Sequence, residues 1–197
     1  FGTQSQLKRD MMAEVAATLA FSTIANNDKV GVIFFSDKIE KYIPAKKGKG
    51  HVLHIIHELL SFEPSSKGTN IAQALQYFAN AQKRRCTAFL ISDFIGAGEL
   101  YKPLLVASNR HEINAIQIYD RRESELPNVG LVKFHDAETG GDLWVDTSVS
   151  SVRHDYAQSW CTNQEMIQQL FTRTGVDHVS VRTDEDYVKA LMHLFKC

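Results

Sequence analysis

Three apolar stretches of this chain each end on an aspartate. They are Val30–Ser36 before Asp37, Cys86–Ser92 before Asp93, and Ile113–Tyr119 before Asp120. In open α/β sheets, ligands collect at the carboxyl ends of parallel strands. The pattern therefore predicts a strand-end site where carboxylates could bind a cation or a partner. Each aspartate also fits a plainer role, because aspartate starts turns and caps helices.

Thr69 and Asp93 are the best candidates for binding a metal. A divalent ion such as Mg²⁺ takes oxygen ligands and keeps several waters, so one hydroxyl and one or two carboxylates can suffice. Thr69 lies in Gly68-Thr69-Asn70 ahead of a helical pattern, and Asp93 closes a strongly apolar run. Loops of this kind meet at a strand-end crevice. Thr69 or Asn70 fits equally well as a helix N-cap.

The elements that would position these residues alternate between strand and helix. This alternation predicts an α/β fold with a three-layer, mostly parallel sheet and helices on both faces. Helical spacing marks Leu7 to Ser22, His51–Phe62, Ile71 to Phe78, Glu99 to Arg110, Ser151–Thr174 and Asp184–Lys196. Strands are predicted at Val30–Ser36, Ile39–Ile43, Cys86–Ser92, Ile113–Tyr119 and Val176–Val181.

Some segments depart from this alternation. Leu131–Asp136 and Asp142–Asp146 are predicted to form a β-hairpin insertion at about 129–147. The glycine-containing basic segment Pro44–Gly50 is predicted to be a solvated loop. Thr183 is the predicted N-cap of the last helix.

Composition indicates one domain over residues 1–197. The 197 residues are 44% hydrophobic, enough for one sizeable core. Lysine plus arginine number 22 against 23 acidic residues, and the net charge is −1. The chain therefore lacks the excess of basic residues that is typical of a nucleic-acid-binding protein. Partners must therefore be recognised locally.

Cysteine usage and apolar run lengths predict a cytoplasmic location. The three cysteines are Cys86, Cys161 and Cys197, without a Cys-x-x-Cys pair, as expected for reduced thiols. The apolar runs are all shorter than the roughly 18 to 20 residues that a membrane-spanning helix needs. The opening residues Phe1-Gly2-Thr3 suggest a fragment of a longer protein, in which a membrane anchor could lie elsewhere.

Familiar catalytic motifs are missing from the sequence. The serines lack a Gly-x-Ser-x-Gly elbow, and the chain lacks a Gly-x-x-x-x-Gly-Lys-Ser/Thr phosphate loop. The spacing of His51, His54 and His57 places the first and last about 120° apart on a helix, which is poor for a shared metal. We therefore predict no catalytic residues.

Several motifs resemble a known family. They are Ala13–Ala20, Asn27–Ile33, Gly68-Thr69-Asn70, Ile91–Phe94, Tyr119-Asp120 with Glu123-x-x-Leu126-Pro127, Asp136-x-Glu138-Thr139-Gly140, and Val145–Thr147. Together they look like the bacterial domain-of-unknown-function 58 family, whose core is similar to a von Willebrand factor type A domain. The resemblance covers most of the chain and implies a Rossmann-like fold of that type.

The resemblance also implies a metal-ion-dependent adhesion site, to which Thr69 and Asp93 would contribute in the intact protein. The Asp-x-Ser-x-Ser element of such sites is absent here, and in the family it stands just ahead of the segment matching Phe1-Gly2-Thr3. Mg²⁺ or Mn²⁺ is thus expected in the intact protein and not in this chain. The central strand carrying that element is absent too. The Val30 and Cys86 strands would then lack their shared neighbour. Because unpaired buried backbone groups are costly, we expect the gap to be filled by another chain, by rearrangement or by further residues.

The function predicted from this resemblance is a protein-interaction module without enzymatic activity. The family implies an adaptor role with a MoxR-type AAA+ ATPase as partner. The alternative is a metal-dependent phosphoester hydrolase using Asp37, Asp93 and Asp120. A further alternative leaves partner recognition to the hairpin from Leu131 to Val145.

Overall fold

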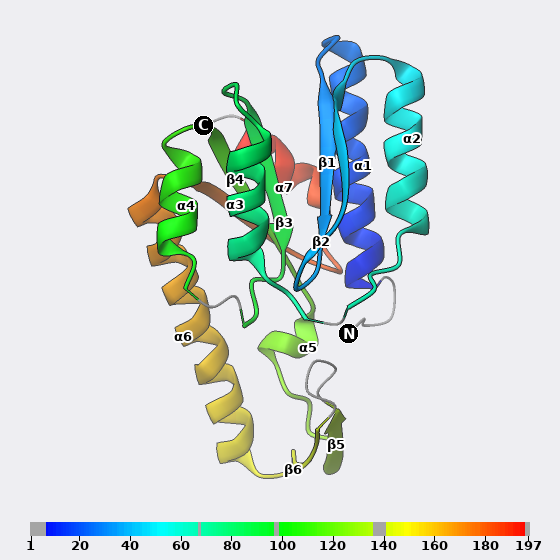
Figure 1. Cartoon of the computed structure of the whole chain (residues 1–197). Helices are drawn as coiled ribbons and strands as arrows, with labels where there is room; N and C mark the ends of the chain where they lie inside the picture. The colour runs from blue at the N-terminus through cyan, green and yellow to red at the C-terminus, as the bar shows by residue number, and fades with distance from the viewer. Residues whose placement is uncertain (1–6, 67, 97–98, 136–140, 196–197) are drawn as a thin grey trace.

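The structure, a computed structural model, describes residues 7–66, 68–96, 99–135 and 141–195 (Figure 1). The helices are α1 (Lys8–Ala25), α2 (Lys49–Ser61), α3 (Ile71–Ala81), α4 (Tyr101–Ser108), α5 (Arg121–Ser124), α6 (Ser150–Thr174) and α7 (Tyr187–Leu194). The strands are β1 (Val30–Phe35), β2 (Ile39–Lys46), β3 (Thr87–Ser92), β4 (Glu112–Tyr119), β5 (Leu131–His135), β6 (Asp142–Asp146) and β7 (Asp177–Arg182).

The centre of the molecule is a parallel sheet in the order β3-β4-β7. Leu90 of β3 pairs with Ala115 of β4, and Ile116 of β4 pairs with Val179 of β7. The middle strand β4 is buried along nearly its whole length. Burial on both faces is expected where helices cover both sides of a parallel sheet, and here it includes the polar residues Asn114 and Gln117.

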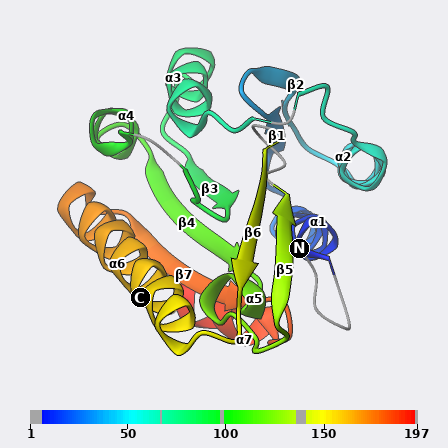
Figure 2. The ribbon, with the colours of Figure 1, turned by 90° about the horizontal axis from the view of Figure 1, so that it is seen from below.

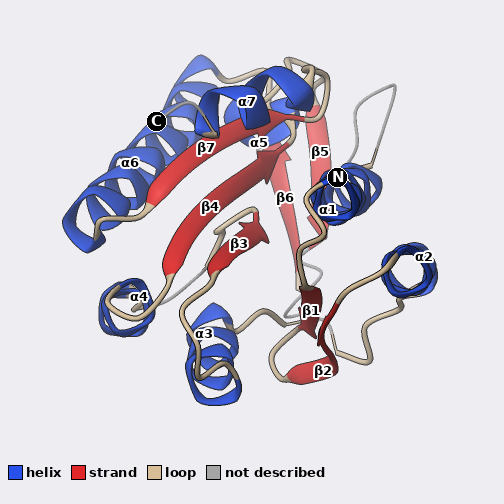
Figure 3. Cartoon of the chain, turned by 90° about the horizontal axis from the view of Figure 1, so that it is seen from above, coloured by secondary structure: helices blue, strands red, loops and turns tan. Residues whose placement is uncertain are grey.

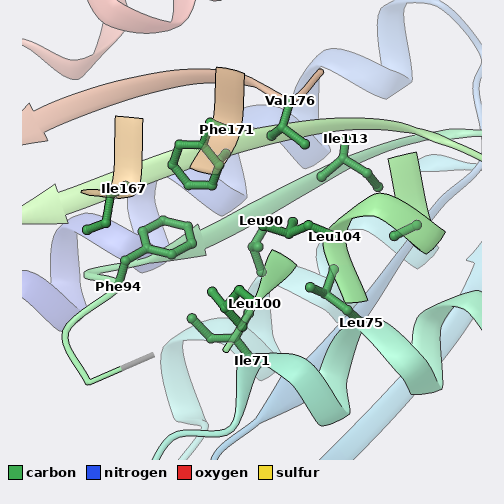
Figure 4. Packing of buried hydrophobic residues seen from close by; sticks show 12 residues of the cluster. Ile71, Leu75, Leu90, Phe94, Leu100, Leu104, Ile113, Ile167, Phe171 and Val176 are labelled. Atoms are coloured by element: carbon green, nitrogen blue, oxygen red, sulfur yellow. The ribbon is translucent and has the colours of Figure 1, made fainter. Parts of the chain in front are cut away.

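One face of this sheet packs against α3, α4 and α6. Figure 4 shows the cluster, in which Leu90 and Ile113 of the sheet meet Ile71 of α3, Leu104 of α4 and Phe171 of α6. Leu104 and Phe171 are fully buried. Fully burying a side chain of this size stabilises the fold by about 1.5–3 kcal/mol.

The opposite face packs against α1 and α7. Met11 and Val15 of α1 join Ile116 and Ile118 of β4 and Leu191 of α7 in a second cluster. The sheet is therefore the middle of three layers, as the strand–helix alternation predicts.

A separate antiparallel ribbon consists of β1 and β2. It forms a third apolar cluster in which Phe34 of β1 and Ile43 of β2 meet α1 and α2. A side chain at Gly31 would place its Cβ 2.7 Å from the Ile43 carbonyl oxygen, so this close approach requires glycine.

β2 is longer than the sequence predicts. The expected loop Pro44–Gly50 is wrong at both ends, because β2 continues through Lys46 and α2 already begins at Lys49. Proline is tolerated at position 44 because β2 is hydrogen-bonded to β1 alone in the described residues, and edge strands accept a missing backbone donor.

The Val30 and Cys86 strands have no shared neighbouring strand among the described residues, and what fills the gap between them stays a prediction. Within the described residues, β1 pairs only with β2, and β3 pairs only with β4. Figure 3 shows β1 set apart from β3, with α1 alongside. Helix α1 joins the two sheets, because Met11 and Val15 pack on the parallel sheet while Ala20 packs on the ribbon.

The predicted hairpin insertion is also confirmed. β5 and β6 are antiparallel, and Val132 pairs with Val145. The hairpin is fixed at its base by Thr147, whose Oγ1 donates to the Gly130 carbonyl oxygen over 2.7 Å. The motif residues Asp136, Glu138, Thr139 and Gly140 lie outside the described residues, as does the opening segment Phe1-Gly2-Thr3.

Candidate functional site

The strands β1, β3 and β4 all end toward the part of the molecule that carries α5 and the hairpin (Figures 1 and 2). Three of the predicted site residues follow these strands: Asp93 and Asp120 come directly after β3 and β4, and Asp37 comes two residues after the end of β1. The fourth, Thr69, lies just before α3. We call this region the strand-end edge. The local environments of the four residues differ widely.

Asp120 is completely buried and caps helix α5. Its Oδ1 accepts a hydrogen bond from the Arg122 amide over 2.8 Å, and its own amide donates to Glu123 Oε2 over 3.2 Å. This reciprocal arrangement is a capping box. Thr183 Oγ1 donates to the other oxygen, Oδ2, over 3.0 Å. Asp120 therefore ties the end of β4 to α5 and to the segment after β7.

The predicted N-cap of the last helix is wrong. Asp186 caps α7 by accepting a hydrogen bond from the Val188 amide over 3.0 Å. Thr183 is buried, and its hydroxyl is directed to Asp120 instead. A buried hydroxyl needs a hydrogen-bond partner, and the Asp120 carboxyl group supplies it.

Asp93 begins a tight turn after β3. Its Oδ1 accepts a hydrogen bond from the Ile95 amide over 3.2 Å, and its carbonyl oxygen accepts one from the buried Gln117 side chain over 3.1 Å. The next residue, Phe94, has a left-handed backbone with φ of 56°. Such a conformation is costly for a bulky residue. It is held here by burial of the Phe94 ring edge-on against Phe171.

The second oxygen of Asp93 pairs with a lysine from the first turn of α1. Lys8 Nζ lies 2.7 Å from Asp93 Oδ2 and is also hydrogen-bonded to Glu123 Oε1. The Lys8 side chain is 14% exposed, Asp93 29% and Glu123 6%. Burial acts to lower the pKa of Lys8, but the two carboxylates outweigh it and hold that pKa above its ordinary value. Lys8 is therefore an ammonium ion at neutral pH.

Asp37 and Thr69 are exposed and lie at the end of the β1–β2 ribbon. The Asn70 amide donates to the Ser36 carbonyl oxygen over 2.7 Å, which holds the start of α3 against the end of β1. Gly68 packs directly against Asp37, since a Cβ added there would lie 3.3 Å from the Asp37 Cβ. Asn70, not Thr69, caps α3 by accepting from the Gln73 amide.

Glu40 is an additional acidic residue at this end of the ribbon. Its carboxylate accepts hydrogen bonds from the Ser36 hydroxyl over 2.7 Å and from the Ser65 hydroxyl over 2.7 Å. These hydrogen bonds from Ser36 and Ser65 lower the pKa of Glu40. Sequence reasoning missed Glu40 because it lies within an alternating strand pattern, where a charged residue normally only faces solvent.

The β5–β6 hairpin lies on the same side of the molecule (Figure 2). It carries exposed apolar side chains. Trp144 is 61% exposed, and Leu131 and Leu143 are similarly exposed. The ion pair between Lys133 and Asp142, 2.7 Å long, accompanies them on the two strands. Exposed aromatic and aliphatic residues beside charged groups are typical of protein-binding surfaces.

The strand-end edge does not fit a divalent ion with the residues described here. Among them, no three His, Cys, Asp or Glu side chains are grouped closely enough to hold one. Asp93 already pairs with an ammonium, and both oxygens of Asp120 accept protein hydrogen bonds. The structure thus joins Asp93 to Lys8 and Glu123, and Asp37 to the segment containing Thr69.

Comparison with known families identifies the family of this chain. The family described as "Protein of unknown function DUF58" matches residues 1–166. The chain belongs to the DUF58 family. Its curated relatives include the uncharacterized protein Mb1516 of Mycobacterium bovis, 28% identical over 192 residues. That match covers 95% of this chain and 60% of the relative, so the chain spans less than two thirds of the relative's length. The uncharacterized protein MAV169 of Mycobacterium avium is 27% identical, over 78% of this chain and 92% of its own length.

Two solved structures share the fold. One is the conserved hypothetical protein BatB from Bacteroides thetaiotaomicron, with a TM-score of 0.55, 16% identity, and coverage of 93% of this chain and 86% of that chain. The other is an aerotolerance-related membrane protein from Bacteroides fragilis, with a TM-score of 0.59, 18% identity, and coverage of 94% and 89%. Within the described part of the present DUF58 chain, the helices all lack the combination of length and apolar character needed to cross a bilayer.

Proposed function

We propose that this DUF58 domain is a protein-interaction module without enzymatic activity, and that it binds its partner through the strand-end edge and the hairpin. One observation carries the proposal: exposed acidic and apolar side chains lie at the same end of the molecule. Asp37 and Thr69 are exposed at the end of β1, and Trp144 is exposed on the hairpin. A polar rim beside an apolar anchor is the usual composition of a protein interface.

The alternative of a phosphoester hydrolase is not favoured by the geometry. Such an enzyme would need Asp37, Asp93 and Asp120 to share metal ions. Asp120 is committed to capping α5, and Asp93 is neutralised by Lys8. Asp37 belongs to a different group of contacts, with Ser36 and Gly68.

We extend the proposal to the partner that the family resemblance implies and to the location that the cysteine usage predicts. A von Willebrand factor A-like domain of this family is expected to work as an adaptor for a MoxR-type AAA+ ATPase in the cytoplasm. The acidic residues Asp37 and Glu40 suit a basic surface on that partner, since complementary charge speeds association and fixes orientation. In the intact protein, Thr69 and Asp93 remain the proposed ligands of Mg²⁺ or Mn²⁺, with further ligands from outside the described residues.

The proposal is tested by measuring binding of a purified MoxR-type ATPase to immobilised domain variants. Thr69→Ala, Asp93→Ala and Trp144→Ser should each weaken binding, and their folding is verified by circular dichroism. Val106→Ser is the control for Trp144→Ser, because Val106 is an exposed apolar residue on α4, away from the hairpin. Unchanged affinity in the three site variants would reject the proposed surface.

A parallel assay addresses the hydrolase alternative. Hydrolysis of p-nitrophenyl phosphate is followed with Mg²⁺ or Mn²⁺ present, for the wild-type protein and for Asp93→Ala. We expect no turnover above the metal-only background. Turnover that disappears in Asp93→Ala would favour the hydrolase over the interaction module.

A further inference from the structure

We propose that the Lys8 ammonium is the resident cation of the strand-end edge and that, lying between Asp93 and Glu123, it excludes a divalent ion from these two carboxylates. Lys8 Nζ contacts Asp93 Oδ2 at 2.7 Å and is hydrogen-bonded to Glu123 Oε1. The three residues come from α1, from the turn after β3 and from α5. Asp93 lies 85 positions after Lys8 in the sequence, and Glu123 lies 115 positions after it. This contact goes beyond the partner proposal and does not depend on it.

The position of Lys8 in its own helix indicates a specific role. Lys8 is the first residue of α1, and Leu7 before it provides no side-chain cap. A cation at a helix N-terminus is unfavourable, because the helix dipole places partial positive charge there. Local preference is usually broken where tertiary structure or function requires it. Here the two carboxylates offset the unfavourable position.

The carboxylates in turn require a cation. Glu123 is nearly buried, and Asp93 is only partly exposed. Two carboxylates brought together out of water repel each other, and removing their counter-ion leaves uncompensated charge. A lysine ammonium is a compact charge with three donors, so it can satisfy both groups at once.

The contact also stabilises the end of the parallel sheet. Glu123 Oε2 accepts the Asp120 amide, so the ammonium is connected through Glu123 to the capping box of α5. Lys8 thereby attaches α1 to both β3 and α5. This attachment holds the Asp93 turn in place through contacts within the protein.

The first experiment compares thermal unfolding of the wild-type protein with Lys8→Met and Lys41→Met. Methionine keeps the approximate length of lysine and removes its charge. Lys41 is the matched control, because it forms an exposed ion pair with Glu58 at 2.6 Å. We expect Lys8→Met to lower the unfolding midpoint by roughly 5 °C and the control to change it little. Equal midpoints for the two variants would overturn the inference.

The second experiment uses Mn²⁺ as the probe of the cation position. Adding millimolar Mn²⁺ should leave the midpoint of the wild-type protein unchanged, because the ammonium repels the ion. In Lys8→Met the same addition should recover part of the lost stability, and this recovery should disappear in Lys8→Met/Asp93→Asn. Equal stabilisation of the wild-type protein and Lys8→Met, or no effect on Lys8→Met, would show that Lys8 does not occupy a cation position.

Discussion

The ends of strands β4 and β1 carry the same sequence signature but have opposite physical character. Asp120 after β4 is fully buried, with both carboxylate oxygens hydrogen-bonded. Asp37 after β1 is exposed and lies against Gly68. An apolar run ending in aspartate therefore does not by itself identify a binding site. Burial and partners decide whether the carboxylate holds the fold together or faces a ligand.

Replacing Asp120 should produce the largest loss of stability. Asp120→Ala removes the α5 cap and leaves the Arg122 amide and the Thr183 hydroxyl without their acceptor. We expect the free energy of unfolding to fall by about 3 kcal/mol in urea denaturation. Asp186→Ala, at the exposed cap of α7, is the matched control and should lose about 1 kcal/mol. Equal losses would contradict the special role of Asp120.

Thr183→Val should lower the free energy of unfolding less than Asp120→Ala does. Valine matches the shape of threonine but cannot donate to Asp120 Oδ2, so we expect a loss of about 1.5 kcal/mol. Thr87→Val is the control, because the exposed Thr87 hydroxyl makes only a 3.3 Å hydrogen bond to Glu112. If chemical denaturation gives the same free energy for both variants, the Thr183 hydroxyl does not support the strand end.

Replacing His111, at the opposite end of β4, should have a milder effect on stability, and this effect should depend on pH. Burial lowers the pKa of His111, and the nearby Arg110 lowers it further. Below pH 6.5 the unfolded chain therefore binds a proton more readily than the folded protein, so stability falls as the pH falls. The pKa of His178 is lowered by burial as well. In His111→Phe the midpoint of thermal unfolding should therefore fall less between pH 7 and pH 5 than in the wild-type protein. An unchanged dependence of the midpoint on pH would contradict the assignment of this effect to His111.

Replacing Asp37 should have the smallest effect on stability. Asp37→Ala changes an exposed side chain in a turn, and we expect the free energy of unfolding to change by less than about 0.5 kcal/mol. Urea denaturation measures this change. A loss comparable to that of Asp120→Ala would mean that the two strand ends share one structural role.

Much of the fold follows from sequence periodicity. The alternation of apolar strands and helices correctly predicts the layered sheet, and the Gly-containing turn between Leu131 and Asp146 correctly indicates a hairpin. The Asp120-x-x-Glu123 spacing is a capping-box signature that was readable in principle. Capping is one of the two roles that the sequence predicts for Asp120, but helix α5 itself was missed because it has 4 residues and therefore no apolar period.

The site could be predicted only in part. The sequence correctly predicts which residues follow the strands. It does not show which of their carboxylates find hydrogen-bond or ion-pair partners within the fold. Lys8 contacts Asp93 and Glu123, which lie 85 and 115 positions further along the sequence. In addition, the helix dipole makes a lysine unfavourable at a helix N-terminus. Tertiary contacts alone decide that Asp93 is neutralised while Asp37 stays exposed.

The most direct test of the difference between the two strand ends is the affinity of a MoxR-type ATPase for Asp37→Ala and Asp28→Ala. Asp28 is an exposed aspartate just before β1, at the opposite end of the same strand. Calorimetric titration should show binding weakened at least about tenfold in Asp37→Ala, equivalent to a loss of about 1.4 kcal/mol, and unchanged in Asp28→Ala. Equal affinity in the two variants would contradict the account, because the exposed strand end would then have no part in recognition.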